Sequence, residues 1–119
     1  MSAPNLLNPT TVTGKAWPGA TTTANSAVAV FTVATGHSYH VRSLFITNKT
    51  TSTTVGVTVD ITRSATAYKF GGAKWTLSPG ATVNVFQGGP GDFEEADVLN
   101  VTCDTVNGLD FCAFGDDIS

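Results

Sequence analysis

The chain has 119 residues, enough for one domain with one core, and its hydrophobic content is 41%. Charged residues make up only 13% of the chain, against roughly 25% in a typical soluble domain. The net charge is −3 and the 6 Lys and Arg residues are scattered, so we expect neither nucleic acid nor an anionic membrane as a partner. No stretch approaches the ~20 apolar residues of a transmembrane helix, and no secretory signal is recognisable. We therefore expect the protein to be made in the cytoplasm.

Prolines and glycines interrupt the apolar pattern of the first 25 residues, with only a brief extended run near residues 11–15. We predict that residues 1–25 form an N-terminal arm with at most one edge strand, preceding a domain over residues 26–119. A flexible tail is the alternative interpretation. Because the apolar residues of the arm lie outside any strand pattern, they are candidates for contact with a neighbouring subunit: Leu6, Leu7, Val12 and Trp17.

From residue 26 onward, short apolar alternations end at Gly, Pro, Asn or Ser about every ten residues, which is typical of a sandwich or barrel. In residues 54–62 the apolar side chains Val55, Val57, Val59 and Ile61 fall on one face and mostly polar residues on the other. A turn at Thr35-Gly36 predicts a hairpin between the strands expected at residues 26–33 and 38–48. The sequence thus predicts an all-β fold, a single β-sandwich of about eight strands, with jelly-roll and immunoglobulin-like orders both open. The expected strands are 26–33, 38–48, 54–62, 66–70, 73–77, 82–86, 98–103 and 109–114.

The two cysteines, Cys103 and Cys112, flank an Asn-Gly pair in the stretch LNVTCDTVNGLDFC. Asn107-Gly108 favours a two-residue type I′ turn, because both residues tolerate positive φ. Such a hairpin would place Cys103 opposite Cys112 with Cα atoms about 4.5 Å apart, within reach of a disulfide. Two ligands are too few for a metal site, and apolar, acidic surroundings do not favour a reactive thiol. A disulfide or two buried thiols remain, and both are structural.

Nothing in the sequence has the pattern of an active site. The segment GDFEEAD holds four carboxylates but lacks the spacing of a calcium loop, so we predict a solvated corner. His37 and His40 lie three positions apart, which places them on opposite faces of an extended chain. We therefore expect no catalytic residue, no cofactor and no metal, and we do not expect an enzyme. The carboxylates are Asp92, Glu94, Glu95 and Asp97.

Four aromatic residues allow one ligand-binding hypothesis. Aromatic rings on a sandwich surface can form a platform on which sugars stack, although such residues more often fill a core or a subunit contact. The candidates for this platform are Trp17, Trp75, Tyr39 and Tyr68.

The order of several segments resembles the small virion structural proteins of tailed bacteriophages, with those of cyanophages and other marine phages nearest in style. The resemblance covers most of the chain. Where such chains often carry an acidic-Gly-Asp turn, this one has Glu95-Ala96-Asp97. The segments that carry the resemblance are SAPNLLNPTTVTGK, VRSLFITN, VGVTVDITR, SPGATV and the closing FEEADVLNVTC and LDFCAFGDDIS.

The resemblance implies a β-sandwich that assembles on the virion, most specifically as a head decoration (cement) protein. Such proteins are commonly homotrimers at three-fold positions of the capsid surface, where they clamp neighbouring subunits of the major capsid protein after the shell expands. A surface rich in Thr, Asn and Gly suits this role, because it can pack against a partner with little desolvation of charge. The alternatives are a neck, tail or fibre component of the virion, and a small carbohydrate-binding β-sandwich module.

Overall fold

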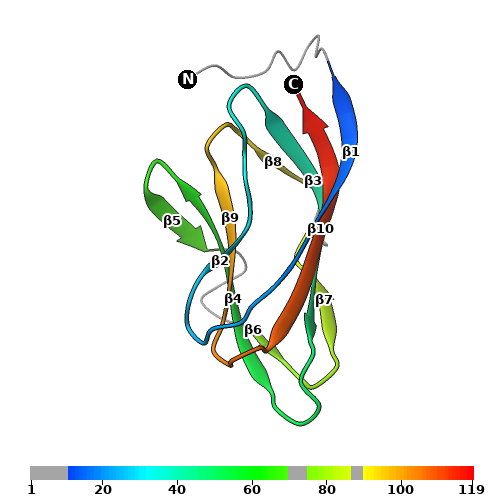
Figure 1. Cartoon of the computed structure of the whole chain (residues 1–119), viewed down its shortest axis with the longest axis vertical. Helices are drawn as coiled ribbons and strands as arrows, with labels where there is room; N and C mark the ends of the chain where they lie inside the picture. The colour runs from blue at the N-terminus through cyan, green and yellow to red at the C-terminus, as the bar shows by residue number, and fades with distance from the viewer. Residues whose placement is uncertain (1–10, 70–74, 87–89) are drawn as a thin grey trace.

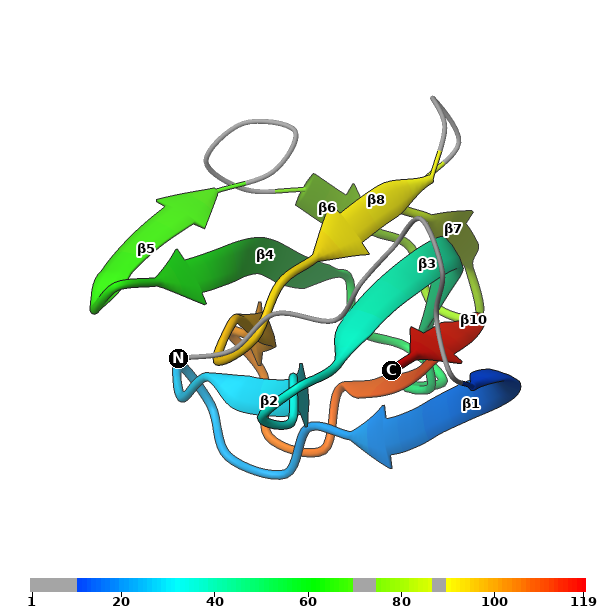
Figure 2. The ribbon, with the colours of Figure 1, turned by 90° about the horizontal axis from the view of Figure 1, so that it is seen from above.

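The computed structural model describes residues 11–69, 75–86 and 90–119. The prediction of an all-β sandwich is confirmed: two antiparallel sheets pack face to face (Figures 1 and 2). Every regular element of the described residues is a strand, and none of them forms a membrane-crossing helix. The strands are β1 (Val12–Ala20), β2 (Val28–Thr32), β3 (Ser38–Asn48), β4 (Val55–Arg63), β5 (Thr66–Lys69), β6 (Trp75–Leu77), β7 (Thr82–Asn84), β8 (Gly91–Phe93), β9 (Val98–Cys103) and β10 (Leu109–Ile118).

The strand order is that of a jelly roll. Sheet A has the order β1-β10-β3-β7, with β8 also paired to β3, and sheet B has the order β2-β9-β4-β5, with β6 also paired to β4. The first strand pairs with the last, β2 with β9, β3 with β7 and β8, and β4 with β5 and β6. These nested pairs form a long antiparallel ribbon. The ribbon is wrapped so that β10 also pairs with β3, and β9 with β4. It excludes the immunoglobulin-like order, in which the first two strands are neighbours.

The core lies between the sheets and is built by the alternation along each strand. In β4 the residues Val55, Val57 and Val59 are at most 1% exposed, as predicted, and Ile61 is half-buried. Full burial of such a side chain contributes about 1.5–3 kcal/mol relative to exposure. The largest fully buried apolar partners come from β3, β9 and β10 and are Leu44, Ile46, Val41, Leu99, Val101 and Leu109.

Both predicted hairpins are wrong, because strands consecutive in the sequence change sheets. β2 belongs to sheet B and β3 to sheet A, and the same holds for β9 and β10. Gly36 and Asn107 have positive φ, of +80° and +52°, but Gly108 does not. The type I′ turn predicted at Asn107-Gly108 needs positive φ at both residues, so neither this turn type nor the pairing across it is formed.

The described part of the predicted arm belongs to the sandwich. β1 pairs with β10 along its whole length, from Val12 opposite Ile118 to Ala20 opposite Asp110. Thr21 follows with no exposed surface, and its hydroxyl accepts a hydrogen bond from the backbone N–H of Leu109. Sheet A thus begins at Val12 rather than at residue 26, because β1 completes the ladder of β10. Leu6 and Leu7 lie outside the described residues.

Candidate functional site

The edge of sheet A is the first candidate surface for binding. Among the described residues, β1 pairs only with β10, so its other side is a free strand edge. Residues 12–16 are exposed, and 59% of Val12 is open to solvent. A free edge offers unpaired backbone N–H and C=O groups to a strand of another chain. Pro18, which cannot donate to a ladder, limits such pairing to the first half of β1.

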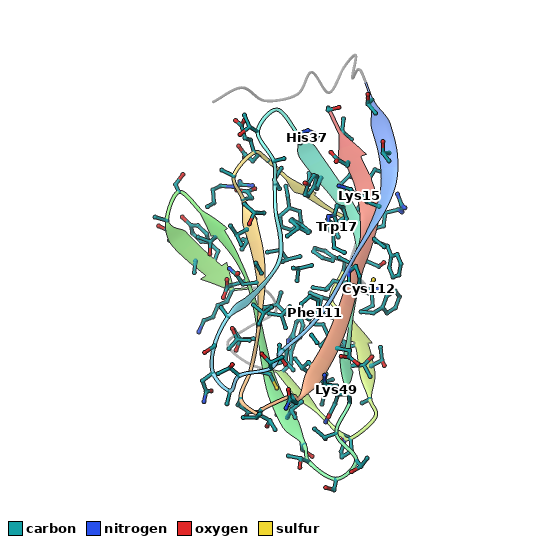
Figure 3. The ribbon with its side chains drawn as sticks, viewed as in Figure 1. Lys15, Trp17, His37, Lys49, Phe111 and Cys112 are labelled. Carbon is teal, nitrogen blue, oxygen red and sulfur yellow. The ribbon has the colours of Figure 1, made fainter. Side chains whose placement is uncertain are left out.

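Trp17 fastens this edge strand to the core. Its ring centroid lies 5.0 Å from that of Phe31 on β2 and 5.0 Å from that of Tyr39 on β3. Aromatic pairs at such distances contribute about 0.5–1.5 kcal/mol beyond the area they bury. Figure 3 shows Trp17 on the side of sheet A that faces sheet B. The proposed contact residues therefore differ: Val12 is open to a partner, whereas Trp17 joins β1 to its own sandwich.

The two cysteines lie in different sheets and both are free thiols, so of the two alternatives the structure does not show the disulfide. Cys103 at the end of β9 is fully buried, and its Sγ accepts a hydrogen bond from Thr105 N–H at 3.4 Å. On β10 the inward residues are Leu109, Phe111 and Ala113. Cys112 therefore points to the outer face of sheet A and is half-buried there (Figure 3). The interpretation as two buried thiols holds only for Cys103.

The acidic segment before β9 is not the solvated corner that the sequence predicted. Asp97 is 1% exposed and Glu95 is 6% exposed. Arg63 at the end of β4 donates to Asp97 through Nε at 2.8 Å and through Nη2 at 2.6 Å, and Glu94 N–H donates to the same carboxylate at 2.9 Å. The hydrogen bond to Asp97 and the charge of that carboxylate raise the pKa of Arg63. These hydrogen bonds hold the end of β4 against the turn at residues 94–97, so we assign Arg63 and Asp97 a structural role.

A cleft of about 400 Å³ lies between β4 and β5 of sheet B and β8 of sheet A. Tyr68, 55% exposed, forms part of its wall, and Asp92 Oδ1 lies 2.5 Å from His40 Nδ1. The predicted sugar platform is not formed, because Trp17 and Tyr39 lie in the aromatic core and only Tyr68 reaches this cleft. The lining residues are Ile61, Arg63, Tyr68, Phe86, Gly91, Asp92 and Phe93.

Metal-ligating side chains do not gather in the described part of the chain: no group of three or more His, Cys, Asp or Glu residues is placed to hold an ion. His37 and His40 each face a carboxylate instead. His37 Nδ1 lies 2.6 Å from Asp117 Oδ1, and His40 pairs with Asp92 as described above.

Comparison with known proteins does not identify a family for this chain. The sequence matches no known protein family and no curated protein. Among solved structures, a similar chain comes from work described as "Bacillus endospore appendages form a novel family of disulfide-linked pili", with a TM-score of 0.47 and 11% identity. The match covers 91% of this chain and 86% of that chain. Similarity at this level carries no inference about what this protein binds.

Proposed function

We propose that this protein is a virion structural subunit, most specifically a head decoration protein that clamps neighbouring major capsid subunits on the capsid surface. The observation that carries the proposal is the construction of β1. Trp17 ties this strand to the core, while its outer edge and Val12 remain open. A rigid sandwich with an open edge can add to a strand of a partner without unfolding.

The residues that precede β1 extend this contact. Leu6 and Leu7 precede the exposed Val12 in the sequence, separated from it by Asn, Pro and two Thr residues, so we infer that they add apolar contacts to that of Val12. Seated around three-fold positions of the shell, as the resemblance implies for a homotrimer, three copies would each contribute one such contact. Modest contacts that act together give high avidity, so none of them needs to be strong alone.

The test is co-sedimentation of the purified protein with expanded heads that lack it. Deleting residues 2–10 removes Leu6 and Leu7 but leaves β1, and we expect binding to be lost while the protein stays folded. A deletion through Trp17 would be a poor test, because it also removes an aromatic residue from the core.

Two valines give a matched pair of substitutions for the same assay. Val12 and Val106 are both 59% exposed, but Val12 begins β1, whereas Val106 lies near the other end of that strand, next to Asn107, which donates to Thr22 O. Val12→Asp should weaken binding to the heads and Val106→Asp should not. Binding by the deletion variant at the wild-type level, or equal loss in both valine variants, would contradict the proposed contact.

The number of copies per particle separates decoration from the other virion roles. Quantitative mass spectrometry of purified particles should find this protein in an amount comparable to that of the major capsid protein. A few copies per particle would instead indicate a neck, tail or fibre component.

The cleft beside β8 favours a second candidate function, binding of a carbohydrate. Its aromatic wall at Tyr68 and Phe86 can pack on a sugar ring, and Asp92 can accept hydrogen bonds from sugar hydroxyls. A glycan array would identify a ligand of this kind, and Tyr68→Ala should then abolish the signal. Absence of binding across the array would exclude this candidate for the glycans tested.

A further inference from the structure

The outer face of sheet A carries an apolar strip that is distinct from the open backbone edge of β1. The register aligns Pro18, Cys112 and Phe45 across three strands, and it aligns Ala16 with Phe114 in the next row. Directly paired residues of an antiparallel sheet lie on the same face. Phe45 and Phe114 are each 41% exposed, with ring centroids 6.2 Å apart. We call these five residues the sheet A strip.

Two ion pairs bound the strip, one at each end. Arg42 Nη1 lies 2.5 Å from Asp116 Oδ2, and Lys49 Nζ lies 3.2 Å from Asp110 Oδ1. Both basic residues belong to β3 or directly follow it, and both acidic residues belong to β10. The face thus has a row of two bases beside a row of two acids, with apolar side chains between the ends.

We propose that this face binds a second copy of the chain in an isologous, two-fold pair. A two-fold axis parallel to the strands and between β3 and β10 places β3 of each copy over β10 of the other. Arg42 then faces the partner's Asp116, and Lys49 faces the partner's Asp110. The sheet A strips meet in the middle, which gives the apolar centre and charged rim of a protein interface.

Charge complementarity is what selects a second copy as the occupant. The chain carries a net charge of −3, so two copies repel each other on average. On this face the row of Arg42 and Lys49 is opposite in charge to the row of Asp116 and Asp110, and the two-fold axis exchanges them; Asp92 on β8, paired with His40, lies outside these two rows. A partner that is uniformly basic or uniformly acidic would complement one row and repel the other.

The size of the face predicts a weak pair. Four strands about 4.8 Å apart span about 19 Å, and the six steps from Asp110 to Asp116 span about 20 Å. A footprint of this size falls below the roughly 800 Å² per partner of a standard interface. Association should therefore depend on concentration over the range from about 1 μM to 1 mM.

Sedimentation velocity across that range is the first experiment. The wild-type mass should rise from 12.3 kDa for one chain to twice that value. Phe45→Ser should keep the protein monomeric, whereas Tyr68→Ser, on sheet B, should leave the association unchanged. A monomer at every concentration, or a mass of three chains, would overturn the two-fold pair; three chains would support the homotrimer instead.

A charge swap tests the geometry itself. Arg42→Glu places an acid over the partner's Asp116 and should reduce association at least tenfold. The double variant Arg42→Glu/Asp116→Arg exchanges acid and base at one end and restores opposite charges across the pair, so it should associate with itself as the wild type does but not with the wild type. Unfolding measurements on each variant confirm that the sandwich is intact. A double variant that stays monomeric although folded, or that pairs with the wild type, would refute this arrangement.

Cys112 gives an independent readout of the same pair. The two Cys112 Cα atoms would lie about 11 Å apart, from a sheet spacing of about 10 Å and a strand spacing of about 4.8 Å. This distance is too long for a disulfide, which needs less than about 7 Å, but a short bismaleimide linker spans it. With Cys103 replaced by Ala, the linker should yield a covalent dimer in the wild-type background and none in Phe45→Ser. An equal yield in both would count against the pair.

Discussion

Replacing Asp97 by asparagine tests how the turn before β9 is held. Asp97 is the most deeply buried charged residue that the structure describes, and its carboxylate accepts three hydrogen bonds, two from Arg63 and one from Glu94 N–H. Asparagine has nearly the same size, so the substitution leaves packing unchanged. It removes the charge, however, and places an NH₂ group against at least one of these N–H donors.

The expected loss of stability follows from these contacts. A hydrogen bond to a charged group contributes about 1.5–3 kcal/mol, and Asp97→Asn loses at least one. The charge itself adds less, because Arg63 is 43% exposed and water can solvate its guanidinium. We therefore expect Asp97→Asn to lower the free energy of unfolding by about 2–3 kcal/mol, a large part of the 5–15 kcal/mol typical of a domain.

Urea unfolding measures this loss as a shift in the midpoint at unchanged slope. Glu94→Gln is the matched control, because it makes the same acid-to-amide change in a carboxylate 3.1 Å from the same Arg63 but 65% exposed. The control should stay within about 0.5 kcal/mol of the wild type. Equal stability of the two variants would refute a structural role for the buried ion pair.

Three further predictions concern the core, a close backbone contact and the thiols. Trp17→Ala should lower the free energy of unfolding by about 2–3 kcal/mol and expose β1 to proteolysis. Protease resistance like that of the wild type would show that other contacts hold this strand. Gly115→Ala should lower the free energy of unfolding by at least about 1–3 kcal/mol, because its Cβ would lie against the backbone oxygen of His40. Gly14→Ala is the control: its Cβ would lie 4.0 Å from Asp116 Oδ1, so its thermal melt should be nearly that of the wild type. A thiol-reactive dye should label Cys112 in the native protein and Cys103 only after unfolding; an intact mass two hydrogens short would instead reveal a disulfide.

The fold class could be predicted from the sequence because burial imposes a period of two on each strand. The run from Val55 to Ile61 shows this period clearly, and the predicted bounds of β3 agree with the structure. The pairing could not be predicted, because Gly36 and Asn107 report only the local backbone. Whether the next strand returns to the same sheet or crosses to the other depends on how the whole ribbon rolls up.

The buried ion pair and the edge strand were missed for related reasons. Arg63 and Asp97 lie 34 positions apart, so no local pattern connects them. Ala96, in the turn that presents Asp97, has a φ of +70°, and an alanine in the sequence does not indicate such a backbone conformation. In β1, Pro18 and Gly19 argued against a strand. An edge strand tolerates proline, and a Cβ on Gly19 would lie 2.6 Å from the ring of Phe111.

The pairing of the first strand with the last has a consequence for how the protein folds. Among the described residues, β1 pairs only with β10, from Val12 opposite Ile118 to Ala20 opposite Asp110. At 5–20 residues per second, synthesis of the chain takes roughly 10 s, during which β1 has no strand to join. Contacts so distant in sequence also close slowly. Sheet A is therefore completed only once β10 has been synthesised, and until then the strand edges that β10 covers are open to pairing with other chains.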